Sequence, residues 1–200
     1  EYTITKGNSI STSVLNKNDY LKFFPSVNLL HQINDNNNIY LNYKKRINRP
    51  RYLTLNPFKY FSSDNSFSTG NPALRPQIDD EVTLGYTFNK DFTFELYYRN
   101  EKDPATEIIF QDNESNLIKY IFSNSDAISY GLDFMTYTQV IPNWNVYASA
   151  SAFYYEDKVL ALESNNALYT IEKWSFYGQV INYFTFLKDN FIKKGNINIG

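Results

Sequence analysis

Carboxylates are the residues of this sequence whose types and spacing could do chemistry. They form two clusters, Asp79, Asp80 and Glu81 in the first and Glu101, Asp103 and Glu107 in the second. Paired carboxylates can perform acid–base catalysis or bind Ca²⁺. Consecutive residues of a strand point to opposite faces, so Asp80 and Glu81 cannot easily share a site. We therefore expect solvated charges here, with no metal site, no cofactor and no catalytic residue.

Aromatic side chains offer a second kind of chemistry, because their rings can stack on a ligand. They gather in one segment, at Tyr52, Phe58, Tyr60, Phe61 and Phe67. The alternative is that these rings pack the segment against itself. Tyr97 and Arg99, on the polar side of an alternating segment, complete the set of candidate ligand-binding residues. A basic run precedes the aromatics, at Lys44, Lys45, Arg46, Arg49 and Arg51.

Composition excludes several classes of protein. The 200 residues carry a formal net charge of -2, so no basic surplus points to nucleic acid. Cys is absent and His31 is the single histidine, which argues against thiolate or multi-histidine chemistry. No apolar run is long enough for a membrane-spanning helix. Aromatic residues reach 18% of the chain, which is unusually high.

Period-two alternation of apolar and polar residues dominates the chain and predicts strands. Asn, Gly and Pro interrupt the sequence too often for long helices. The sequence therefore predicts an all-β fold. The alternating segments are residues 38–44, 81–88, 92–99, 130–140, 144–154 and 174–186.

Short and long connections alternate between these segments. Tight turns are predicted at residues 35–37, 89–91 and 141–143, and long connections at residues 46–80, 100–127 and 156–171. An antiparallel up-and-down transmembrane β-barrel has this pattern, with its short turns at one end and its long loops at the other. Aromatic residues flank both ends of the segments, as expected for two interfacial girdles. Trp144, Phe92, Phe88 and Phe186 lie beside the tight turns, and Tyr98, Tyr130, Tyr154 and Trp174 lie at the opposite ends.

One combined motif resembles a known family. Residues 46–58 read R-I-N-R-P-R-Y-L-T-L-N-P-F and residues 70–77 read G-N-P-A-L-R-P-Q, before the strand at residues 81–86. This is similar to the C-terminal barrel of TonB-dependent outer-membrane receptors, in particular the outer membrane protein β-barrel family common in Bacteroidetes-type bacteria. The prolines force extended or turn geometry, and Gly70 supplies a permissive backbone. The motif's expected role is structural.

The resemblance implies a place in the cell outer membrane and a role in nutrient uptake. It implies as partners the membrane lipid and lipopolysaccharide, the receptor's own plug domain, the TonB system and a nutrient ligand. The basic run could contact lipopolysaccharide phosphates or be a solvated loop. Such receptors have barrels of about 22 strands, so residues 1–200, with about eight or nine strands and no plug, are expected to be a fragment of one barrel domain. The alternatives are a non-transporting barrel that acts as scaffold or adhesin, and a soluble carbohydrate-binding β-protein.

Overall fold

The computed structural model describes residues 2–9, 14–21, 23–161, 167–186 and 193–199, and nearly all of them lie in strands. The one helix among them, α1 (Tyr52–Leu55), is a single turn. No helix in this part of the chain is long and apolar enough to cross a membrane. The strands are β1 (Tyr2–Ser9), β2 (Val14–Leu21), β3 (Ser26–Asn34), β4 (Asn37–Asn48), β5 (Tyr60–Ser63), β6 (Ser66–Thr69), β7 (Gln77–Phe88), β8 (Phe92–Gln111), β9 (Ile118–Ile141), β10 (Trp144–Ala161), β11 (Ala167–Phe186) and β12 (Lys193–Ile199).

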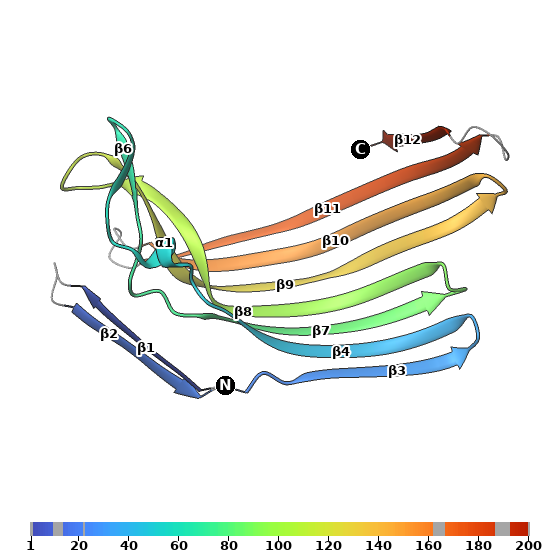
Figure 1. The fold of residues 1–200 in the computed structure, drawn as a ribbon, viewed down its shortest axis with the longest axis horizontal. Coiled ribbons are helices and arrows are strands. Elements are labelled where there is room, and N and C mark those ends of the chain that lie inside the picture. Colours follow the sequence, from blue (N-terminus) through green and yellow to red (C-terminus); the bar gives the residue numbers. More distant parts are fainter. Residues whose placement is uncertain (1, 10–13, 22, 162–166, 187–192, 200) are drawn as a thin grey trace.

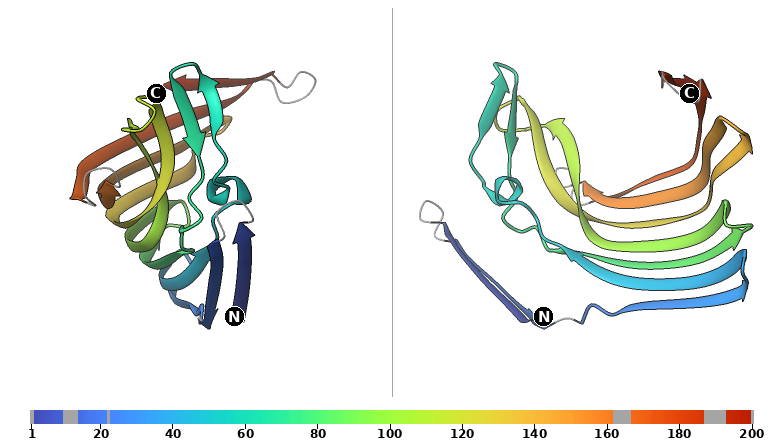
Figure 2. Two further views of the ribbon diagram at one scale, coloured as in Figure 1. Left: turned by 90° about the vertical axis from the view of Figure 1, so that its left-hand side faces the viewer. Right: turned by 45° about the vertical axis from the view of Figure 1, so that its right-hand side comes forward.

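A ten-stranded sheet forms the body of the described chain, with the path β12-β11-β10-β9-β8-β7-β4-β3. Every pair along this path is antiparallel. β5 and β6 lie off the path, and β6 runs parallel to β9. β1 and β2 form a separate two-stranded sheet. The path confirms the predicted up-and-down fold, and the curved sheet is open, with β3 and β12 as its edges (Figures 1 and 2).

The tight turns at Asp35, Asn89 and Pro142 all lie at one end of the sheet, as the connection pattern predicts (Figure 1). Positive φ angles at Asn89 (50°) and Lys90 (63°) suit a tight hairpin turn. Backbone hydrogen bonds also tie each turn to the element beside it, which is another turn in one case and a strand in the other two. These bonds run from Lys90 N to Asn36 O (2.9 Å), from Tyr137 N to Asp91 O (3.3 Å) and from Thr185 N to Asn143 O (2.8 Å).

Two of the predicted long connections are wrong, because strands continue through them. β8 extends to Gln111 and β9 begins at Ile118, so most of residues 100–127 is a paired hairpin. β10 and β11 likewise pair as far as Ala161 and Ala167. The alternation of apolar and polar residues is not visible in the sequence here. One row of the apolar side contains the polar residues Lys102, Asp126 and Lys158 in place of apolar ones. Within this hairpin, residues 107–111 pair with residues 118–122.

The sheet has one apolar face and one polar face. Leu84 and Leu96 are opposite each other in the apolar face, whereas Glu95 lies opposite Gly85 in the polar face. The described chain leaves the apolar side chains uncovered, as on the lipid-facing surface of a membrane barrel; Phe176 is 79% exposed. One apolar row runs through Leu29, Leu41, Leu84, Leu96, Leu132, Ala152 and Phe176, and one polar row through Tyr40, Gly85, Glu95, Asp133, Ser151 and Tyr177.

Aromatic rings mark both ends of the apolar face. Trp144 and Tyr154 lie about 33 Å apart along β10 at the usual rise per residue, and strand tilt reduces this to a height of about 25 Å, the thickness of an outer-membrane apolar band. Near the turns, Trp144 stacks on Phe184 at 5.7 Å; the side chain of Phe186 lies outside the described residues. At the other end is the tyrosine row, which comprises Val27, Tyr43, Val82, Tyr98, Tyr130, Tyr154 and Trp174.

Polar residues begin on the apolar side immediately beyond the tyrosine row. The next row contains Asp80, Asn100, Glu156 and Glu172. The Tyr154 hydroxyl donates a hydrogen bond to Glu172 (2.8 Å), so this ring keeps its polar tip toward the charged row. This is how tyrosine behaves at a membrane interface. The few buried apolar side chains in the described chain also gather at this loop end of the sheet, at Phe67, Leu74, Ile78, Ala127 and Val159.

Candidate functional site at the loop end of the sheet

The two halves of the combined motif are hydrogen-bonded to each other. α1 places Thr54 and Asn56 so that their carbonyls accept hydrogen bonds from the amides of Asn71 (2.7 Å) and Gly70 (2.9 Å). A Cβ on Gly70 would lie only 2.5 Å from the Asn56 carbonyl oxygen. The glycine is therefore required for this close approach of two backbones. The spacing of the motif fixes a folded loop over residues 49–76.

Hydrogen bonds between side chains and backbone groups hold this loop against the β8–β9 hairpin. The Asn71 amide donates a hydrogen bond to the carbonyl of Phe122 (3.0 Å). Asn124 accepts a hydrogen bond from Arg75 N (2.9 Å) and donates to Asp103 O (2.9 Å). The Arg75 guanidinium also pairs with Asp103, at a β-bulge where Asp103 has a φ of 59°. Sequence reasoning missed Asn124, because nothing in its local pattern distinguishes it from other strand residues.

The five loop aromatics predicted to bind a ligand fall into two groups. Tyr52, Phe58, Tyr60 and Phe61 are 76%, 63%, 48% and 66% exposed. Phe67 is 1% exposed and packs 5.8 Å from Phe61, with the Lys59 ammonium 4.6 Å from its centroid. Phe67 therefore serves the internal packing of the loop, the alternative that the sequence left open. Ligand contact by the four exposed rings stays a prediction.

The other two candidates, Tyr97 and Arg99, lie on the polar face of β8. Arg99 donates two hydrogen bonds to the Glu81 carboxylate, from Nη2 at 2.8 Å and from Nε at 2.9 Å. Lys44 pairs with the same carboxylate, so one ionic chain crosses β4, β7 and β8. Tyr97 lies between Thr83 and Gly131 in the neighbouring row. Tyr97 and Arg99 thus lie near each other on the polar face of β8. The loop aromatics belong to a different part of the chain, the loop over residues 49–76.

The carboxylates of the first cluster are divided between the two faces, as alternation predicts. Asp80 accepts hydrogen bonds from the Tyr43 hydroxyl (2.7 Å) and the Lys45 ammonium (3.0 Å) on the apolar side. Glu81 pairs with Lys44 and Arg99 on the polar side. Within the described residues, no group of three or more His, Cys, Asp or Glu side chains could hold a metal ion.

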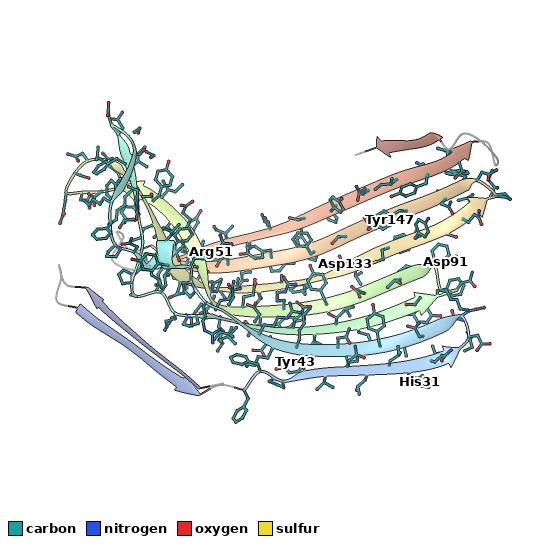
Figure 3. The ribbon with its side chains drawn as sticks, viewed as in Figure 1. His31, Tyr43, Arg51, Asp91, Asp133 and Tyr147 are labelled. Carbon is teal, nitrogen blue, oxygen red and sulfur yellow. The ribbon has the colours of Figure 1, made fainter. Side chains whose placement is uncertain are left out.

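The predicted basic run is divided in the same way. Lys44 lies on the polar face and Lys45 on the apolar side. Arg46 is opposite Asp79 in a polar row. Arg51 lies beside α1, at the end of the molecule opposite Asp91 and the tight turns (Figure 3). The run is therefore not a single basic patch.

Comparisons with known proteins agree with this two-faced sheet. Residues 1–196 match the outer membrane protein beta-barrel family. Among solved structures, the crystal structure of the siderophore receptor PirA from Pseudomonas aeruginosa has a similar fold, with a TM-score of 0.57 and 15% sequence identity. The match covers 92% of this chain and 38% of that receptor chain. No curated protein sequence matches this chain. Since the family match spans almost all of its residues, this chain belongs to the outer membrane protein beta-barrel family and resides in the outer membrane.

Proposed function

We propose that this chain forms part of the barrel wall of a TonB-dependent receptor that imports a nutrient across the outer membrane. The observation that carries the proposal is the polar face, where charged and hydroxyl groups from several strands lie opposite the apolar face. Lys44, Glu81 and Arg99 form an ionic chain across three strands, and the Ser151 hydroxyl donates to Asp133 in a neighbouring part of the wall. Such a lining suits a lumen that holds a plug domain and passes a polar ligand.

The proposed mechanism begins with ligand capture in the loop region. Tyr52, Phe58, Tyr60 and Phe61 offer exposed rings there, and the bonds that dock the loop on β8 and β9 hold them in place. Energy from the TonB system would then rearrange the plug and admit the ligand. The siderophore receptor with a similar fold supports a scarce, tightly bound nutrient as the cargo. The motif similarity supports a Bacteroidetes-type source.

We further propose that the chain is not an enzyme. Its sequence contains no Cys, and its single histidine, His31, lies opposite Ile39 beside a tight turn, away from the charged rows at the loop end. Glu81, the carboxylate at the centre of the ionic chain on the polar face, is paired with Lys44 and Arg99. This arrangement suits binding and transport.

Transport is tested with the complete protein in its own outer membrane. Cells that carry or lack the gene would receive hydroxamate and catecholate siderophores loaded with radioactive iron. Binding would be measured on ice and uptake at growth temperature, with and without a protonophore. We expect gene-dependent binding in both conditions and uptake that the protonophore abolishes.

The variant Tyr52→Ala, made together with Phe58→Ala, should weaken binding on ice. Phe176→Ala is the matched control, because this ring is 79% exposed but lies on the apolar face. Gene-dependent binding without any protonophore-sensitive uptake would instead favour the scaffold or adhesin.

A further inference from the structure

The distal part of β8, residues 105–111, is an edge strand. β7 pairs with β8 only as far as Lys102, opposite Ile78. A β-bulge follows, where Asp103 has a φ of 59° and Pro104 has no N–H to donate. Residues 105–111 then pair with β9 alone, and β9 pairs with β6 on its other side. The hairpin therefore extends past β7 with one side of β8 uncovered by any strand of the described chain (Figure 1).

The hydrogen-bond pattern of the hairpin identifies the backbone groups on this free side. In an antiparallel pair, successive residues of a strand bond alternately to their two sides. The Asp112 amide donates to Leu117 O across the hairpin (2.8 Å), which assigns the even-numbered residues of the segment to β9. The N–H and C=O groups of Glu107, Ile109 and Gln111 therefore point away from β9.

Two hydrogen bonds on β9 support this assignment independently. Ile118, the register partner of Gln111, donates its amide to Asn65 O on β6 (2.9 Å). Phe122, the register partner of Glu107, accepts at its carbonyl from the Asn71 side chain (3.0 Å). Both partners direct these groups away from β8, as residues of non-hydrogen-bonded pairs do. On β8 a row of alternating donors and acceptors is left open, over about 14 Å from residue 107 to residue 111.

The side chains along this edge are apolar at its centre. Ile109 is 59% exposed, and its row continues across the hairpin and the β5–β6 pair through Tyr120, Ser68 and Tyr60, the last of which is 48% exposed. Cross-strand pairs of apolar side chains stabilise a sheet. An apolar residue opposite Ile109 would therefore extend a row that is already present.

Glu107 supplies a negative charge on the same side of the hairpin. Its carboxylate is exposed and makes no ion pair within the part of the chain that the structure describes. Lys102, the lysine of β8, lies beyond the bulge and opposite Asp126. Lys119 belongs to the row of the other side, with its ammonium 5.3 Å from the Phe110 ring centroid. A basic side chain is therefore favoured opposite Glu107.

We propose that the free edge of β8 binds an extended polypeptide, which joins the sheet as an antiparallel strand with a basic residue opposite Glu107 and an apolar residue opposite Ile109. A row of N–H and C=O groups at this spacing is complementary to another strand. The bound strand would take the place that β7 has beside the first half of β8. Antiparallel pairing matches β7 and β9, the two neighbours of β8. The proposal is independent of transport.

The test uses the complete protein, purified in detergent, and a fluorescent nine-residue peptide as the probe. In this peptide valine alternates with threonine, except that a lysine stands two positions after the central valine. Fluorescence anisotropy measures its affinity. We expect Ile109→Pro to weaken binding about tenfold, because proline removes an N–H from the free edge and leaves the bonds to β9 in place. Ile109→Val is the matched control and should bind like the unaltered protein.

Modified probes test the backbone pairing and the charge separately. N-methylation of the central valine and of the lysine blocks the amides that would face β8, and it should abolish binding. N-methylation of the two threonines beside the central valine is the control, because their amides would face away. Glu107→Lys should weaken binding of the lysine peptide about threefold and strengthen binding of a glutamate version by a similar factor.

Amide hydrogen exchange shows whether the edge is open in the complete protein. Without peptide, the Ile109 amide should exchange fast and the Ile108 amide slowly, and the probe should slow Ile109 alone. Thermal unfolding of all variants is recorded to show that they remain folded. Protection of Ile109 without peptide would overturn the proposal, because another part of the protein would then cover the edge. Equal affinity for the two methylated probes, unchanged affinity in a folded Ile109→Pro protein, or no binding of the unmodified probe at about 1 mM would also overturn it.

Discussion

Gly70 and Gly85 occupy places where neighbouring groups fill the space that a Cβ would need. At Gly85 the obstruction is the Tyr40 ring, whose Cζ lies 2.0 Å from the ideal Cβ position. Tyr40 crosses over this glycine, its Cα partner in β7, and its hydroxyl donates a hydrogen bond to Glu95 on β8. An aromatic ring that covers a strand glycine is a known way to pin register. Single residues thus tie three strands of the polar face together.

The variant Gly70→Ala should loosen the loop over residues 49–76. The added methyl group would meet the Asn56 carbonyl oxygen at 2.5 Å, and overpacking of this kind costs about 1–3 kcal/mol. Limited proteolysis of the folded protein would detect the change as faster cleavage within the loop. Gly178→Ala is the control, since no heavy atom lies within 4 Å of its ideal Cβ. Equal cleavage rates for the two variants would contradict the role given to Gly70.

At the scale of elements, the β8–β9 hairpin ends in a compact turn organised by Asp112. Its backbone amide donates to the carbonyl of Leu117 (2.8 Å), and its own carbonyl accepts from Asn116 N (2.8 Å). Its carboxylate accepts hydrogen bonds from the Ser115 hydroxyl (2.6 Å) and amide (3.2 Å). These bonds lower the pKa of Asp112 below its ordinary value.

Acid should therefore open this turn. Because the folded pKa is the lower one, the stabilisation is complete above the unfolded value of about 3.9 and disappears as the pH falls through the folded value. Amide hydrogen exchange at Ser115, corrected for its intrinsic pH dependence, should show protection at neutral pH that is lost in acid. In Asp112→Asn the protection should no longer vary with pH in this window. Persistent acid sensitivity in that variant would assign the effect to another group.

Deleting residues 65–76 should be more damaging than deleting residues 112–116. The first segment contains β6, which pairs with β9, and the bonds that dock Asn71 and Arg75 on the hairpin. The second removes only a turn, and loop ends tolerate such changes. Surface immunodetection and ligand uptake would be measured for both proteins. A greater loss from the shorter deletion would place ligand recognition in the hairpin tip.

The sequence pattern predicted the strands correctly within the apolar band, but it did not predict their continuation beyond the band. Val82, Leu84 and their neighbours alternate cleanly because lipid and lumen demand opposite side chains at successive positions. Beyond the tyrosine row polar residues such as Lys102 and Asp126 enter the apolar side, so residues 100–127 lost the pattern although the strands continue. The hydrogen bond between Arg75 and Asn124 could not be predicted from the sequence either, because a contact between residues 49 positions apart leaves no local pattern. The loop aromatics were found, but the burial of Phe67 could not be foreseen from its type.

At the scale of the whole molecule, the two faces of the sheet define its orientation in the membrane. Ala148 lies in the apolar face between Thr136 and Val180, and Ser149 in the polar face between Met135 and Gln179. Ala148→Arg should cost about 2–4 kcal/mol of stability in lipid, because it places a charge near the bilayer midplane. Ser149→Arg, one residue away, should cost much less. Denaturant unfolding of the complete protein in liposomes would measure both, and a reversed order would mean that the faces are assigned the wrong way round.

The length of β9 has a consequence for what the cell presents to its surroundings. From Tyr130 in the tyrosine row, this strand continues to Ile118, up to about 40 Å further along its axis. The hairpin tip is therefore a projecting epitope that lies beside the β5–β6 turn, whose Asn65 carbonyl accepts a hydrogen bond from Ile118 N. An antibody against residues 112–116 should stain intact cells, whereas one against the turn at Pro142 and Asn143 should require permeabilised cells.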